Sequence, residues 1–139
     1  MTSLHEMNTI RQIPFLRAAL LIDAIASGLT AALLVAGADA LRDWLGLPVA
    51  LMREAGVVLV FYVAFVVFVA TRAQIAAGAV WTVIVCNALW TLASFAILKA
   101  GLIAPTTPGT AFVIGQALAV LALGALQLVA LRRPQASPA

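Results

Sequence analysis

The sequence has little charge, one histidine and one cysteine, and these shortages restrict its chemistry. Only 9% of its 139 residues are charged, against about 25% in soluble domains. His5 lies in the polar N-terminal segment, so a pair of histidines cannot bind haem within an apolar segment, and a histidine-based triad is not expected. Cys86 has no second cysteine for an internal disulfide or a CxxC motif. We therefore predict no enzyme activity, no metal and no cofactor.

Hydrophobic residues, by contrast, make up 65% of the chain. A small soluble domain leaves much of its surface in water and could not hide so many apolar side chains. The eight lysines and arginines sit near the ends of apolar segments, as expected where cations meet lipid headgroups. They form no basic stripe, so nucleic acid is not an expected partner. The expected partner is the lipid bilayer.

Four apolar stretches reach the length of about 20 residues that a transmembrane helix needs. They are residues 15–36, 51–70, 75–98 and 110–131. None alternates strictly between apolar and polar residues, so barrel strands are not indicated and helices are. The predicted fold class is all-α, an integral membrane four-helix bundle.

The connections predict how the chain is organised. Between residues 38 and 47, Leu41, Trp44 and Leu45 share one face, which indicates a short interfacial helix with Trp44 at headgroup level. Thr107 and Pro108 are expected to open the fourth span as cap and first-turn proline. The predicted parts are a cytoplasmic N-tail (1–14), a first hairpin (15–72, with the interfacial turn 38–47), a second hairpin (73–132) and a polar C-tail (133–139).

The first span also has features of a cleavable signal peptide, because Arg11 and Arg17 precede an apolar run that ends in small residues. That run is longer than a usual signal core and contains Asp23, so we favour a retained span. Lysine and arginine bias sets the predicted orientation. The N-tail, second loop and C-tail hold five basic residues and the other two loops three, which favours a multi-pass inner-membrane protein with both termini in the cytoplasm.

An internal repeat relates the two hairpins. Shifting the first span by 64 positions places Asp23 on Asn87, Ser27 on Thr91 and Thr30 on Ser94. Shifting the second span by 60 positions places Pro48 on Pro108, Val60 on Val120 and Arg72 on Arg132. Polar matches at a fixed offset favour a duplication. Because each copy has two spans, the halves should be related by an axis along the membrane normal, as in parallel repeats.

Asp23 is the one residue deep within a predicted span whose side chain is ordinarily charged at neutral pH. A charge at mid-membrane costs a few kcal/mol or more, so Asp23 should face the bundle interior and find partners. At a rise of 1.5 Å per residue, Asp23 lies about 4 Å from the middle of its span, and Asn87 and Tyr62 lie within about 1 Å of theirs. We expect these three side chains to meet in one layer, where Gly124 leaves room for them.

Helical spacing extends this intramembrane polar layer along three spans. The candidate site residues are Asp23, Ser27, Thr30, Tyr62, Asn87, Trp90, Thr91, Ser94, Gln116 and Gln127. Their functional interpretation is a ligand, proton or ion site between the repeats. Their structural interpretation is hydrogen bonding that joins the helices. We favour the structural one for the hydroxyl and amide side chains, and both stay open for Asp23.

Three functions are compatible with these features. The leading hypothesis is a non-enzymatic assembly or accessory protein that associates with itself or another membrane protein through small residues such as Ala111, Gly115 and Ala119. The second is a small transporter or channel subunit that uses Asp23. The third is a lipid- or quinone-binding module with Trp90 and Tyr62 as walls.

Overall fold

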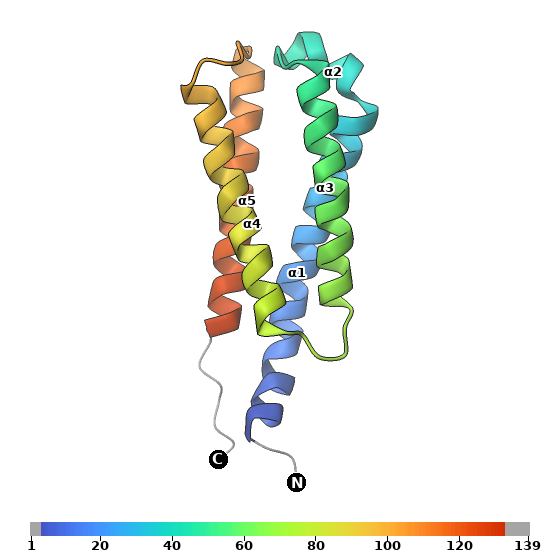
Figure 1. Ribbon diagram of the computed structural model, residues 1–139, viewed down its shortest axis with the longest axis vertical. Helices are drawn as coiled ribbons and strands as arrows, with labels where there is room; N and C mark the ends of the chain where they lie inside the picture. The colour runs from blue at the N-terminus through green and yellow to red at the C-terminus, as the bar shows by residue number, and fades with distance from the viewer. Residues whose placement is uncertain (1–3, 133–139) are drawn as a thin grey trace.

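A computed structural model of the chain describes residues 4–132, with side chains from Pro14 onward. Its five helices are α1 (Leu4–Ala36), α2 (Ala38–Leu45), α3 (Val49–Ala70), α4 (Ala77–Lys99) and α5 (Thr107–Arg132). The described part contains no strand. All but α2 are long and apolar enough to cross a membrane (Figure 1). The predictions of an all-helical fold and of four apolar spans are confirmed, and the predicted C-tail lies outside the described residues.

The helix ends differ from the predicted ones at several points. Helix α1 begins at Leu4, so most of the predicted N-tail is helical, and Pro14 lies inside the helix where the apolar stretch starts. Helix α5 does not use Thr107 as its cap. The backbone N–H of Gly109 donates to the hydroxyl of Thr106 at 3.1 Å, so the predicted cap is wrong by one residue.

The four long helices form a bundle that is open along one side. Helices α1 and α3 pack closely together, as do α4 and α5, and α1 also packs against α5. Helices α3 and α4 scarcely touch, although they follow each other in the chain (Figure 1). The α1–α3 contact is tight at Gly56, where an added Cβ would lie 2.6 Å from Cγ2 of Val35. The bundle is therefore closed between α1 and α5 and splayed between α3 and α4.

One end of the bundle is held by contacts between α2 and the loop that enters α5. Gly46 ends α2 in the left-handed conformation (φ 66°), and its N–H donates to the carbonyl of Arg42 at 2.8 Å. The hydroxyl of Thr106 donates to the carbonyl of Trp44 at 2.6 Å, and its N–H donates to that of Leu45 at 3.0 Å. These bonds satisfy carbonyls at the end of α2 and join the two hairpins.

At the opposite end, Arg17 joins α1 to the end of α3. Its guanidinium donates to the carbonyl of Ala70 and, at 2.9 Å, to that of Arg72. A cation at the C-terminus of a helix is favourable because it satisfies free carbonyls and complements the helix dipole. Arg17 lies near the end of the first span, and it also links α1 to the C-terminal end of α3.

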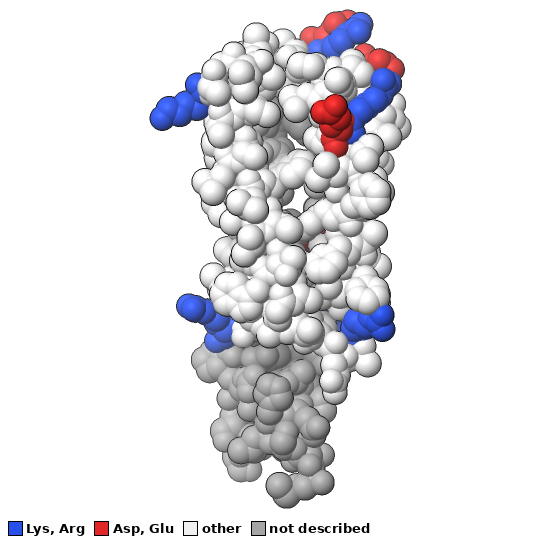
Figure 2. Space-filling model, viewed as in Figure 1, with Lys and Arg blue, Asp and Glu red and all other residues white. Residues whose placement is uncertain are grey.

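Charged side chains gather at the two ends of the described bundle, and between them the outer surface in Figure 2 is white, with red visible only inside a hollow. Among the described side chains, from Pro14 to Arg132, the charged groups at the end near Arg17 are all basic and are Arg17, Arg72 and Arg132. The α2 end carries three basic and three acidic groups, which are Asp39, Arg42, Asp43, Arg53, Glu54 and Lys99. Arg53 and Asp39 form an exposed ion pair at 2.6 Å.

Candidate functional site: the polar interior of the bundle

The interior contains a cluster of polar side chains to which all four long helices contribute. The Asp23 cluster consists of Asp23 and Ser27 from α1, Tyr62 from α3, Asn87 from α4 and Gln127 from α5. Asp23 and Gln127 are fully buried. Each residue comes from the buried face of its helix, because polar groups within a membrane are stabilised by turning toward one another.

The carboxyl group of Asp23 is the centre of this cluster. Its Oδ1 accepts from the hydroxyl of Ser27 at 3.0 Å. Its Oδ2 lies 2.6 Å from the hydroxyl of Tyr62, 3.1 Å from Nδ2 of Asn87 and 2.7 Å from Nε2 of Gln127. The same Nδ2 of Asn87 donates to Oε1 of Gln127 at 2.9 Å, and Oδ1 of Asn87 lies 2.8 Å from the Tyr62 hydroxyl. One carboxyl group therefore connects four helices.

Glycine and threonine bring α4 and α5 close enough for these bonds. An added Cβ at Gly124 would lie 3.2 Å from Cβ of Asn87, tighter than ordinary contact. The hydroxyl of Thr91 lies 2.9 Å from the carbonyl of Asn87 and 3.3 Å from that of Ala117 on α5. A larger residue at position 124 would push Asn87 away from Asp23.

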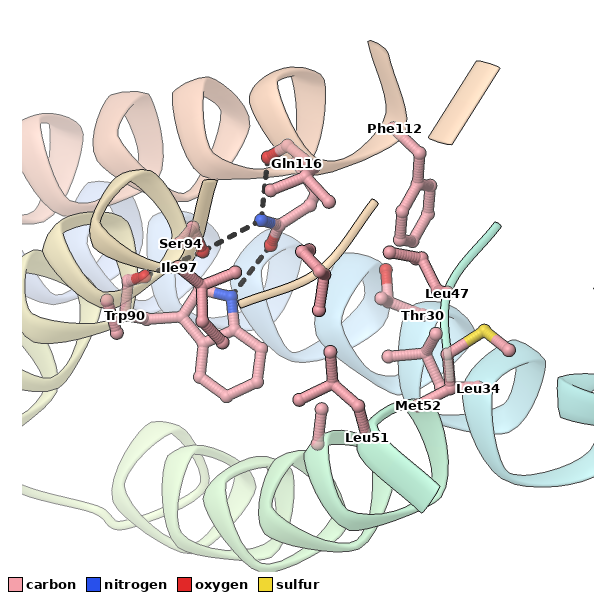
Figure 3. A pocket seen from close by; sticks show the side chains of 14 residues that line it. Thr30, Leu34, Leu47, Leu51, Met52, Trp90, Ser94, Ile97, Phe112 and Gln116 are labelled. Carbon is pink, nitrogen blue, oxygen red and sulfur yellow. Dashed lines mark hydrogen bonds between the residues drawn. The ribbon is translucent and has the colours of Figure 1, made fainter. Parts of the chain in front are cut away.

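A second polar cluster lies closer to the α2 end. The Gln116 cluster consists of Trp90, Ser94 and Gln116, and Figure 3 shows its bonds. The indole N–H of Trp90 donates to Oε1 of Gln116 at 2.7 Å, and Nε2 of Gln116 donates to the Ser94 hydroxyl at 3.0 Å. The hydroxyl of Thr30 joins neither cluster and donates to the carbonyl of Ala26 in its own helix.

The splayed side of the bundle forms a groove between α3 and α4. Two neighbouring cavities, of about 220 Å³ and 580 Å³, share Trp90 and Ala93 as walls. We call them together the α3–α4 groove. Its lining is mainly apolar and includes Leu51, Met52, Leu59, Phe61, Tyr62 and Phe65 on the α3 side and Cys86, Asn87, Trp90, Ala93 and Ile97 on the α4 side. Tyr62 and Asn87 thus belong both to the groove wall and to the Asp23 cluster.

The ten candidate residues separate into groups. Asp23, Tyr62 and Asn87 meet in one layer beside Gly124, and Ser27 and Gln127 join them. Trp90, Ser94 and Gln116 form the second cluster, while Thr91 bonds to backbone and Thr30 faces the groove. Sequence reasoning missed the groove and its further walls Phe61, Phe65 and Cys86. Phe65 lies one helical spacing of three positions from Tyr62, but this signal could not show that α3 and α4 separate.

The arrangement is suited to holding helices together, since its hydroxyls, amides and one carboxyl bond to one another across helices. No group of three or more metal-binding side chains occurs among the described residues. Comparisons with known protein families, curated proteins and solved structures found no match to this chain. The chain is, by its four long apolar helices, a small multi-pass membrane protein.

Proposed function

We propose that this protein is a non-enzymatic assembly or accessory protein that acts by binding other molecules within the membrane, and first of all a second copy of itself. The observation that carries the proposal is the contrast between its interior and its outer face. The interior polar groups bond to one another, whereas α5 leaves small residues uncovered. Beyond the adjacent residues of α5, no atom lies within 4 Å of where a Cβ at Gly115 would be, and Ala111 and Ala119 beside it are exposed.

Residues at this spacing on a membrane helix favour association. Ala111, Gly115 and Ala119 follow one another at intervals of four and lie on one face of α5. Small residues let two helix backbones approach closely, so that van der Waals contacts hold the pair together. We call this surface the α5 small-residue face.

The oligomeric state in a mild detergent tests the proposal. We expect the wild-type protein to sediment as a dimer or larger species, and Gly115→Leu to sediment as a monomer. The Cβ of a residue at position 115 would meet nothing beyond the adjacent backbone of α5, so the subunit fold should survive. Ala96→Leu on the exposed side of α4 is the matched control and should behave as wild type. A monomeric wild-type protein would contradict self-association.

The α3–α4 groove favours a second candidate, a lipid- or quinone-binding module. Trp90 and Tyr62 are groove walls, as ring-stacking residues for such a ligand should be. Mass spectrometry of the same purified protein tests this function. A stoichiometric apolar molecule that is retained by wild type and lost in Trp90→Ala would support it.

The transport alternative needs an aqueous route to Asp23. The Asp23 side chain is fully buried, and both its oxygens already have partners from the protein. These contacts support a structural role for the cluster over an ion path.

We further propose the inner membrane as the location, both termini on the cytoplasmic side, and a duplicated hairpin as the origin of the fold. The basic groups described at the end near Arg17, with Arg72 and Arg132 beside it, support the orientation. The contact between Asp23 and Asn87 supports the duplication, because equivalent residues meet at an axis that relates two copies. The close α1–α5 and splayed α3–α4 contacts are a departure from that symmetry.

A further inference from the structure

The number of hydrogen atoms available around Asp23 can be compared with the number of close polar contacts, each of which needs one. Five close contacts join Oδ2 of Asp23, the hydroxyl of Tyr62 and the amides of Asn87 and Gln127. Each contact between two oxygens, or between oxygen and nitrogen, needs one bridging hydrogen. The hydroxyl of Tyr62 carries a single hydrogen, yet it lies 2.6 Å from Asp23 and 2.8 Å from the amide oxygen of Asn87.

A charged Asp23 cannot satisfy all five contacts, whichever way the amides are turned. If Tyr62 donates to Asp23, its contact with the oxygen of Asn87 has no hydrogen. Turning the Asn87 amide over repairs that contact but brings its oxygen against Asp23 at 3.1 Å and against Oε1 of Gln127 at 2.9 Å. Turning Gln127 as well places an amide oxygen 2.7 Å from the carboxylate. Every arrangement leaves two oxygen atoms in contact without a hydrogen, a costly result in a buried site.

One additional proton completes the network. With a hydrogen on Oδ2, Asp23 donates to Tyr62, and Tyr62 donates to the amide oxygen of Asn87. The amide nitrogens of Asn87 and Gln127 then donate to Oδ2, and Ser27 donates to Oδ1. We propose that Asp23 is a proton-binding site, in which a neutral carboxylic acid donates its proton to Tyr62.

The electrostatic surroundings agree with this assignment. The side chains bonded to Asp23 are all neutral, and no cation compensates a carboxylate there. Arg17, on the same helix, donates to the carbonyls of Ala70 and Arg72 instead. The titratable groups that face the site are Tyr62 from α3 and Cys86 from α4, and residues 107–131 of α5 contain none. An unpaired buried charge would cost several kcal/mol, whereas a neutral acid carries no such penalty.

Infrared spectroscopy of the purified protein tests the proposal, which does not depend on the self-association proposed above. A protonated carboxylic acid has a carbonyl stretch well separated from that of a carboxylate, and the stretch shifts in heavy water. We expect this band in wild type at pH 7 and its complete loss in Asp23→Asn. Asp43→Asn is the matched control, since Asp43 is highly exposed, and should leave the band unchanged. Absence of the band in folded wild type, or its persistence in Asp23→Asn, would overturn the proposal.

Two further measurements keep the test decisive if Asp23→Asn fails to fold. Isotopic labelling of the three aspartate carboxyl groups in wild type should shift the band, because the other two aspartates are exposed at the α2 end. Tyr62→Phe removes the acceptor of the proton and should move the band while retaining it. A band that does not shift when the aspartates are labelled would show that the proton is not held by Asp23. A band that Tyr62→Phe does not move would show that the proton is not held between Asp23 and Tyr62.

Discussion

At the scale of single residues, Asp23 is a polar group whose burial in a membrane is costly and whose hydrogen bonds join several helices. It makes one bond within α1 and contacts to three other helices. Interhelical hydrogen bonds in membranes contribute only about 0.6 kcal/mol each on average. Their combined effect is therefore modest in energy but specific in geometry, since only one arrangement of the four helices brings the partners together.

Substitutions at Asp23 separate a structural from a transport role. Asp23→Asn keeps a neutral hydrogen-bonding group, so its melting temperature in detergent should stay within a few degrees of wild type. Asp23→Leu leaves Tyr62, Asn87 and Gln127 without this partner and should lower the free energy of unfolding by roughly 2 kcal/mol. If the protein is an assembly or accessory protein, Asp23→Asn should complement a deletion strain. A folded Asp23→Asn protein that fails to complement would instead favour transport.

The layer of Asp23, Tyr62 and Asn87 could be predicted from sequence because helical rise converts residue number into depth. Gln127 was on the predicted stripe of its span, but its direct bond to Asp23 depends on how far α5 is rotated, which sequence spacing leaves free. The same limit applies to Trp90 and Gln116. Their bond forms a separate cluster because the two residues lie nearer the α2 end than the layer around Asp23.

At the scale of elements, the four spans were predictable because lipid requires each crossing segment to satisfy its backbone internally. The residues at which the helices end were less predictable from sequence, because the caps depend on tertiary contacts. Thr106 caps α5 while its hydroxyl also donates to Trp44 in α2, a partner 62 positions away in the chain. The separation of α3 from α4 could not be predicted from the sequence either, because both helices are apolar on nearly every face.

The contact between α2 and α5 should be sensitive to a single methyl group. An added Cβ at Gly109 would lie 1.8 Å from the carbonyl oxygen of Leu45, so Gly109→Ala must displace backbone. We expect it to lower the free energy of unfolding by about 3 kcal/mol, at the upper end of usual overpacking costs. Thermal unfolding in detergent, followed by circular dichroism, measures this loss.

Gly78→Ala is the matched control for that experiment. Position 78 lies in the first turn of α4, and nothing beyond the adjacent residues of α4 lies within 4 Å of the added Cβ. Alanine there should leave stability unchanged or raise it by about 0.5 kcal/mol, because it restricts the unfolded chain. Equal stability of the two variants would contradict the tight α2–α5 contact.

At the scale of the whole molecule, the distribution of charge predicts the orientation in the membrane. Among the side chains that the structure describes, the end near Arg17 has three basic groups and no acidic one, whereas the α2 end has as many acidic as basic groups. Basic residues are enriched on the cytoplasmic side of membrane proteins. The loop between α3 and α4 should therefore be cytoplasmic and the loop between α4 and α5 external.

Cysteine labelling checks this orientation. Gln74→Cys and Leu102→Cys place reporters in the two loops, both at exposed positions, in a Cys86→Ala background. An impermeant maleimide should label position 102 in intact cells and position 74 only after permeabilisation. A permeant maleimide should label both. Labelling of position 74 from outside would reverse the topology.

The spread of the Asp23 partners along the chain has a consequence for biosynthesis. Asp23 lies in the span that precedes those of its partners, and Tyr62, Asn87 and Gln127 follow 39, 64 and 104 positions later. During translation the carboxyl group enters the membrane before any interhelical partner exists, and the last partner arrives only with α5. A chain that stops before α5 would therefore leave Asp23 without its bond to Gln127, and an incompletely bonded polar group in lipid is costly.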